Sequence, residues 1–122
     1  MYICEVMKEI GKDLIASSLA PMVLMILKRQ ESYGYDLIQQ LKEKSGGNLE
    51  VAEGTLYPVL KKMETKAWIE AEWKKAENGR ERKYYKITSK GMAELDAQIG
   101  QWDFIYHLMQ QLWQPTLTLN KQ

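Results

Sequence analysis

The sequence predicts a mainly α-helical chain with one small β-hairpin, which places it in the α+β class. Three patterns indicate this class: helical spacing of apolar residues up to about residue 67, apolar–polar alternation on both sides of Asn78-Gly79, and heptad spacing through the C-terminal part. A chain of 122 residues can bury one modest core. We expect a compact domain over 1–88, a long helix over 89–114 and a flexible tail over 115–122.

The N-terminal third predicts two helices. Residues 3–14 can form a short helix, which Gly11 weakens. Ser17 or Ser18 then suits the N-cap of a second helix, and Pro21 would fall in its first turn, where proline is tolerated. The segment "MVLMILKRQ" is apolar on nearly all sides, so this second helix should be the buried central one.

A third helical pattern follows in "YGYDLIQQLKEK". Ser32 is a natural N-cap for it, and Gly34, Leu37, Ile38 and Leu41 share one face. The glycines of "SGGN" (45–48) accept left-handed backbone and should end the helix.

The segment "EGTLYPVLKKME" (53–64) has helical spacing although it contains Pro58. If Gly54 is the N-cap, Pro58 is the fourth helical residue, close to a terminus where backbone donors lack partners anyway. The inward residues are then Leu56, Val59, Leu60, Met63 and Ala67. The outward residues are Thr55, Pro58, Lys61, Lys62 and Thr65.

The next segment predicts a β-hairpin because the period changes from 3.6 to 2. In "IEAEWK" and "RKYYKIT" apolar or aromatic residues alternate with polar ones. Asn78-Gly79 between them is a strong turn signal, with positive φ favoured at both positions. The hairpin tip is basic, with cations at Lys74, Lys75, Arg80, Arg82 and Lys83.

A final helix is expected from a cap at Thr88 or Ser89 to a point before Pro115. About 25 residues would span roughly 37 Å, and its apolar residues follow each other in steps of three and four, as in a coiled coil. The preceding domain is too small to cover this face, which predicts a two-chain interface; the alternative is a helix folded back on its own domain. The predicted interface residues are Leu95, Ile99, Trp102, Ile105, Leu108, Met109 and Leu112.

The charge distribution is uneven although the net charge is only +1. Residues 55–90 contain ten Lys or Arg and five Glu, an excess typical of a surface that meets phosphate, although a solvated charged face is the alternative. The central helix, the helix that contains "YGYDLIQQLKEK" and the helix over 53–64, followed by a basic hairpin, predict a winged helix-turn-helix with a long C-terminal dimerisation helix. In this fold the third of these helices, 53–64, enters the DNA major groove. The predicted DNA contacts are Tyr33, Thr55, Tyr57, Lys61, Lys62, Lys74, Arg80, Arg82 and Lys83.

Several other classes of protein are disfavoured. His107 is the single histidine, and the sequence has no metal-ligand cluster or phosphate-binding glycine loop, so we expect no enzyme activity, metal or cofactor. Cys4 is the single cysteine, which suits a reducing cytoplasm. The longest apolar run is too short to cross a membrane. The remaining rival is a winged-helix protein-interaction module that does not bind DNA.

Three motifs resemble the PadR family of bacterial transcriptional regulators: "YGYDLIQQL" (33–41), "EGTLYPVLKKME" (53–64) and "GRERKYYKITSKG" (79–91). The resemblance covers about residues 13–113, and the single C-terminal helix is similar to that of the short subfamily. It implies a homodimeric repressor, often of transporter, detoxification or stress genes. It also implies release from the operator when a small aromatic or hydrophobic effector binds.

The resemblance further implies an effector site at Trp102, as in multidrug-sensing members of the short subfamily. There the two copies of this tryptophan face each other across the dimer and stack on a flat ligand, which fits the chemistry of an indole. The alternative is that Trp102 simply fills the dimer seam. Neighbouring candidates are Asp103, Tyr106, Leu14 and Ile15.

Overall fold

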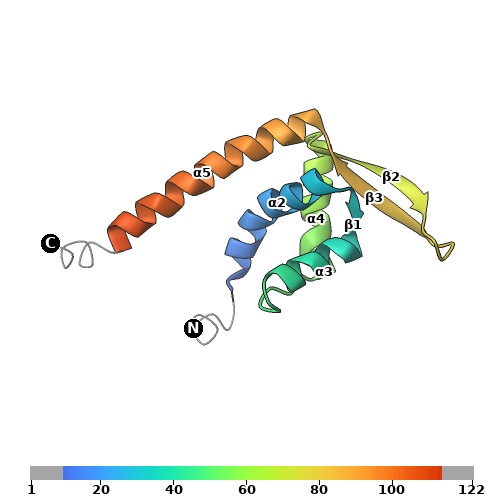
Figure 1. The fold of residues 1–122 in the computed structure, drawn as a ribbon, viewed down its shortest axis with the longest axis horizontal. Coiled ribbons are helices and arrows are strands. Elements are labelled where there is room, and N and C mark those ends of the chain that lie inside the picture. Colours follow the sequence, from blue (N-terminus) through green and yellow to red (C-terminus); the bar gives the residue numbers. More distant parts are fainter. Residues whose placement is uncertain (1–9, 114–122) are drawn as a thin grey trace.

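The computed structural model describes residues 10–113 and confirms the α+β class. Its elements are α2 (Lys12–Arg29), β1 (Ser32–Tyr33), α3 (Gly34–Lys44), α4 (Glu53–Thr65), β2 (Ile69–Lys75), β3 (Glu81–Ile87) and α5 (Ser89–Trp113). Figure 1 shows α2, α3 and α4 as one unit, with the β2–β3 hairpin on one side and α5 projecting toward the other. The predicted tail over 115–122 lies outside the described residues.

Helix α2 differs from the prediction at its start. It runs without interruption for 18 residues from Lys12, so Pro21 lies inside the helix and not in its first turn. The Pro21 ring is buried, and Ser17 and Ser18 are not caps; their hydroxyls donate to carbonyl oxygens one turn back, Ser18 to that of Leu14 at 2.8 Å. Burial of the proline ring in the core offsets the missing backbone hydrogen bond. Most of the predicted 3–14 helix lies outside the described residues.

The hydrophobic core lies around α2, as its apolar composition predicted. Helix α2 contacts α4, α5 and β3. The core side chains are Leu19, Val23, Leu24, Leu27, Leu37, Leu41, Leu49, Val51, Leu56, Leu60, Met63, Ile69, Tyr85 and Leu95. Leu95 is therefore a correction to the predicted dimer interface: it is only 1% exposed, because the first turns of α5 pack on their own domain.

The start of α3 also differs from the prediction. Ser32 is not the N-cap; it forms β1 with Tyr33, and its hydroxyl donates to Asp36 Oδ2 at 2.6 Å. Strand β1 pairs with β3, with Tyr33 opposite Tyr84, so that the sheet has three strands in the order β1-β3-β2. The C-terminal end of α3 is as predicted, since Gly46 and Gly47 both have positive φ.

The hairpin is confirmed, but its turn is of a different type. Strands β2 and β3 pair from Ile69 opposite Ile87 to Lys75 opposite Glu81. Only Gly79 has a positive φ, of 83°, and the Gly79 amide donates to the Ala76 carbonyl at 2.9 Å. This pattern is a tight turn followed by one left-handed glycine, which needs no positive φ at the asparagine.

Helix α5 begins where the hairpin returns to the core. The Thr88 hydroxyl accepts the Gly91 amide at 3.0 Å and donates to the Ala67 carbonyl at 2.6 Å, which confirms Thr88 as the cap. Ala67 follows α4 with φ of 64° and is exposed, contrary to its predicted inward position. Gly91 lies against the Trp68 carbonyl, so the α4–β2 turn holds the start of α5 in place.

Candidate nucleic-acid interface

Helix α4 begins earlier than predicted. Its first residue is Glu53 and its N-cap residue is Ala52, not Gly54, so Pro58 lies in the second turn. Pro58 cannot donate to the Gly54 carbonyl, but both residues are exposed and water can satisfy that oxygen. The proline is therefore tolerated because its turn faces solvent, and not because it lies in the first turn.

The outward face of α4 is as predicted. Thr55, Pro58, Lys61 and Lys62 are all exposed, while Leu56, Leu60 and Met63 are buried. The side chains of Thr55 and Lys62 are seven residues apart and therefore share one side of the helix. This face offers one hydroxyl and two cations to a ligand in front of it.

Tyr57 is 43% exposed and lies across the start of α3. A Cβ atom added to Gly34 would come within 2.2 Å of the Tyr57 hydroxyl oxygen, so glycine at this position makes room for the tyrosine. The tyrosine thereby connects α3 and α4 at the edge of the exposed face.

The wing, defined as β2, β3 and their turn, is linked to α4 by polar contacts. Lys83 Nζ lies 3.7 Å from Glu64 Oε1 on α4. Tyr85 lies in the same region: burial raises the pKa of its hydroxyl above the ordinary value, and the nearby Glu64 carboxylate and Tyr57 raise it further. The hairpin therefore lies beside α4, with Lys83 and Tyr85 on the side that faces Glu64.

The other face of the wing carries a second cluster. The Tyr33 and Tyr84 rings lie edge to face with centroids 5.2 Å apart, and the Arg82 guanidinium lies 4.3 Å from the Tyr33 ring centre. Lys74 forms an ion pair with Glu31, and this hydrogen bond raises the pKa of the lysine, against the opposing effect of desolvation. The Tyr33 ring therefore packs against Arg82, which leaves less of the ring free to contact a ligand.

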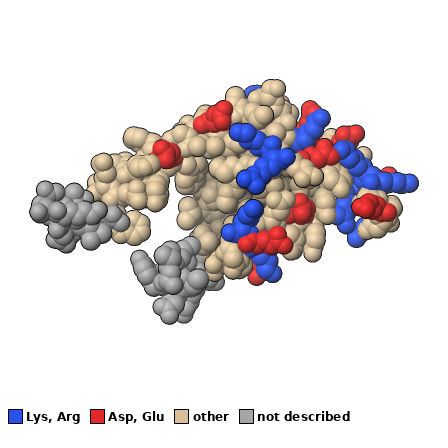
Figure 2. Space-filling model, in the orientation of Figure 1, with Lys and Arg blue, Asp and Glu red and all other residues tan. Residues whose placement is uncertain are grey.

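Charge is segregated along the molecule. Figure 2 shows Lys and Arg side chains, with Asp and Glu among them, over the three-helix unit and the wing, whereas the projecting half of α5 carries almost no charge on this face. Lys74 and Lys83 already have carboxylate partners, whereas among the ion pairs of residues 10–113 none involves Lys61, Lys62 or Arg80. These three and Arg82 are the cations among the predicted DNA contacts that take part in none of those ion pairs.

The structure brings only some of the predicted effector residues close to one another. Trp102 is 38% exposed and Tyr106 is exposed on α5, while Asp103 lies 3.3 Å from His107 Nδ1. Leu14 is exposed on α2, but Ile15 points away from it, into a cavity of about 770 Å³ between α2 and the α3–α4 loop. Neighbouring helical residues differ by about 100° in direction, so the two do not face the same space.

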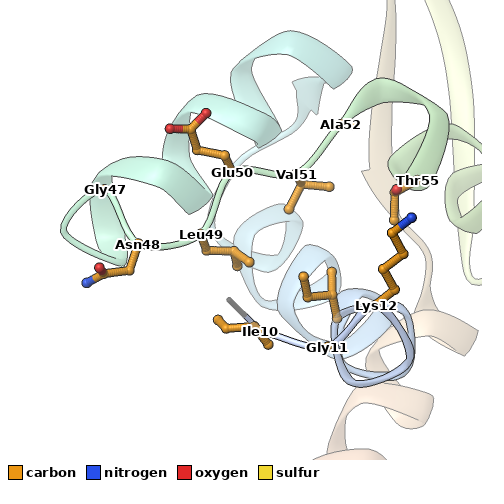
Figure 3. Close-up of a pocket in the computed structure, with 11 residues that line it drawn as sticks. Ile10, Gly11, Lys12, Gly47, Asn48, Leu49, Glu50, Val51, Ala52 and Thr55 are labelled. Carbon is orange, nitrogen blue, oxygen red and sulfur yellow. The ribbon is translucent and has the colours of Figure 1, made fainter. Parts of the chain in front are cut away.

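This cavity was not predicted from the sequence. Figure 3 shows Ile10, Leu49 and Val51 lining it, with the Lys12 side chain reaching toward Thr55 at the start of α4. Lys12 thus adds a cation beside the outward face of α4. In the sequence, Lys12 is only a charged residue near the start of a helix. Its position beside α4 could not be predicted, because it depends on how α2 and α4 pack together.

Three packed helices with a basic hairpin beside the third define a winged helix-turn-helix, the architecture of a DNA-binding transcriptional regulator. A family model described as the transcriptional regulator PadR-like family matches residues 23–97. The chain belongs to this family. Since its members are regulators of transcription, the expectation that the protein is not an enzyme is confirmed.

Individual relatives agree with this assignment. The chain is 33% identical to a PadR-like transcriptional regulator from Bacillus cereus, with a TM-score of 0.73 over 84% of this chain and 97% of that one. It is 32% identical over 93 residues to an uncharacterized protein of Lysinibacillus sphaericus, covering 76% of this chain and 85% of that protein. A regulator from Clostridium thermocellum shares the fold, with a TM-score of 0.75 at 23% identity over 81% of this chain and 96% of that one.

Two further structural findings concern other classes of site. Among the helices of residues 10–113, none is long and apolar enough to cross a membrane. Within the same residues, no three His, Cys, Asp or Glu side chains are grouped so that they could hold a metal ion.

Proposed function

We propose that the protein is a cytoplasmic, homodimeric repressor that binds a palindromic operator and leaves it when a small aromatic or hydrophobic effector binds. The observation that carries this proposal is the separation of two surfaces. Exposed cations on α4 and the wing lie at one end, and an uncovered apolar helix face lies at the other. Residues 12–88 would form the DNA-binding unit and α5 the dimerisation helix.

The apolar face of α5 supports the dimer. Between residues 97 and 113 the one acidic or basic side chain, apart from His107, is Asp103. Large apolar patches on a single chain mark interaction surfaces, and heptad spacing favours a second helix as the partner. The exposed members are Ile99, Trp102, Ile105, Leu108, Met109 and Leu112.

The proposed dimer sets the form of the operator. Two recognition helices related by twofold symmetry would enter adjacent major grooves, about 34–36 Å apart, and read an inverted repeat. Thr55, Tyr57 and the lysine pair would meet base edges and phosphates, while Arg80 and Arg82 would lie along the flanking backbone.

Lys61→Ala and Lys62→Ala test the DNA-binding face. Each variant should bind operator duplex roughly tenfold more weakly and reduce the slope of log K against log salt by about 0.9, the effect of losing one phosphate contact. Fluorescence anisotropy at several salt concentrations measures both quantities. Lys90→Ala is the matched control, because it removes the same charge at the start of α5.

The salt dependence also separates the proposal from its rival. A protein-interaction module would not need these cations, so wild-type protein would then bind duplex DNA weakly and without a preferred sequence. If the wild type bound operator DNA tightly and both lysine variants bound it equally well, the outward face of α4 would not be part of the DNA interface.

Trp102→Ala tests the effector site. We expect the variant to lose binding of a planar aromatic cation such as acridine orange, measured by dye anisotropy without DNA, because the stacking surface is removed. Trp102→Phe should retain part of the affinity, and both variants should keep the operator affinity of the wild type. If Trp102→Ala bound the dye with the same affinity as the wild type, Trp102 would not bind the effector and would serve only to fill the dimer seam.

A further inference from the structure

Trp73 on β2 is an exposed aromatic residue that none of the roles above uses. Its side chain is 65% exposed, although it alternates in phase with Ile69, which is buried, and Ala71, which is half-buried. The wing extends beyond the three-helix unit (Figure 1), and along β2 the side chains on this face change from buried at Ile69 to exposed at Trp73. The indole therefore has no apolar surroundings in residues 10–113 that explain its size.

The surroundings of Trp73 place it beside the proposed DNA surface. It lies directly opposite Lys83 in the β2–β3 register, and Lys83 in turn reaches Glu64 of α4. Side chains two residues apart on a strand share a face, so the indole lies on the side of the wing that faces α4. Further along the hairpin, Lys75 shares this face and lies opposite Glu81, while Arg80 in the turn adds another cation.

We propose that Trp73 packs against deoxyribose rings in the wall of the minor groove that flanks the site read by α4. This inference rests on the proposed DNA-binding function and adds a contact that is apolar rather than ionic. An indole offers a flat surface that matches the apolar face of a sugar, and its burial on binding is favourable. The cations around it attract a polyanion, which favours duplex DNA over an apolar protein partner.

The proposal makes a specific distinction between neighbouring side chains. A phosphate contact releases counterions when it forms, so its removal lowers both affinity and salt slope. An apolar contact with sugar releases none, so its removal should lower affinity alone. Trp73 and Lys83 are cross-strand neighbours and can be compared directly on the same strand pair.

The test uses the full chain and a duplex selected from random-sequence DNA with wild-type protein. Trp73→Ala should bind this duplex roughly fivefold to tenfold more weakly at every salt concentration, with an unchanged salt slope. Trp73→Phe should recover part of the loss. Trp113→Phe, which alters an exposed tryptophan at the opposite end of the molecule, should bind like the wild type. Thermal melting checks that each variant is folded.

Three results would overturn the inference. If folded Trp73→Ala bound the duplex as tightly as the wild type, the indole would not contact DNA, and binding to a protein partner would explain its exposure instead. A reduced salt slope would mean that Trp73 acts by placing Lys83 against phosphate. An equal loss in Trp113→Phe would show a general effect of removing tryptophan. If no duplex is recovered with wild-type protein, the proposed function itself has failed, and this outcome is distinct from the other three.

Discussion

Ile105→Glu is expected to convert the proposed dimer into a folded monomer and to weaken operator binding roughly 100-fold or more. Ile105 is 44% exposed in the single chain, so the glutamate is tolerated there. In the dimer it would bury a charge in an apolar seam, which costs several kcal/mol. Size-exclusion chromatography with light scattering measures the mass, and anisotropy measures operator affinity.

His107→Glu provides the matched control for this substitution. It introduces the same side chain two residues later, about 200° around α5, on the exposed side that carries Asp103. We expect it to remain dimeric and to bind the operator as the wild type does. A dimeric Ile105→Glu variant would show that α5 pairs through another face, and a monomeric wild type would refute the dimer.

Among the substitutions of glycine by alanine in this chain, Gly91→Ala is expected to lower the free energy of unfolding the most. The added Cβ would lie 2.0 Å from the Trp68 carbonyl oxygen and 2.9 Å from Ile87 Cγ1. The first contact is with backbone, which cannot rotate away, so α5 or the α4–β2 turn must shift. We expect a loss of about 3 kcal/mol or more in the free energy of unfolding and a melting temperature lower by roughly 10 °C or more.

Gly100→Ala is the control, because it lies in the same helix and nothing lies within 4 Å of its added Cβ. Helix propensity alone should stabilise this variant by about 0.5–1 kcal/mol. Circular dichroism melts of the two variants should therefore move in opposite directions. Similar melting temperatures would show that the start of α5 is not held against the Trp68 carbonyl.

The elements that the sequence predicted well have strong local signals. The hairpin follows from period-two alternation around Asn78-Gly79, and the outward face of α4 follows from the phase of Leu56, Leu60 and Met63. The charge surplus of residues 55–90 follows from the sequence alone, and the cations Lys61, Lys62 and Arg80 within it are exposed in the structure. Each of these depends on neighbours in the chain and on the geometry of one helix or one strand pair.

The predictions that failed depend on contacts between distant segments. Pro21 was placed in a first turn, but its ring is buried inside α2. Ser32 was assigned as a cap, but it pairs with Tyr85 in a strand of two residues. Leu95 was assigned to the dimer, but α5 covers its own domain at that point. A local pattern cannot show which partner a side chain meets, so these three depended on packing.

The sequence by itself determined the order of the main helices and of the two hairpin strands, though not β1, together with the basic character of α4 and the wing and the resemblance to PadR regulators. These are properties of periodicity, turn residues and charge, which act over a few residues. Only the tertiary structure decided that Lys12 extends toward Thr55, that Lys83 is paired with Glu64, and that Trp73 is left exposed on the wing. Burial and ion pairing arise from packing of segments far apart in the chain, and no spacing within one segment encodes them.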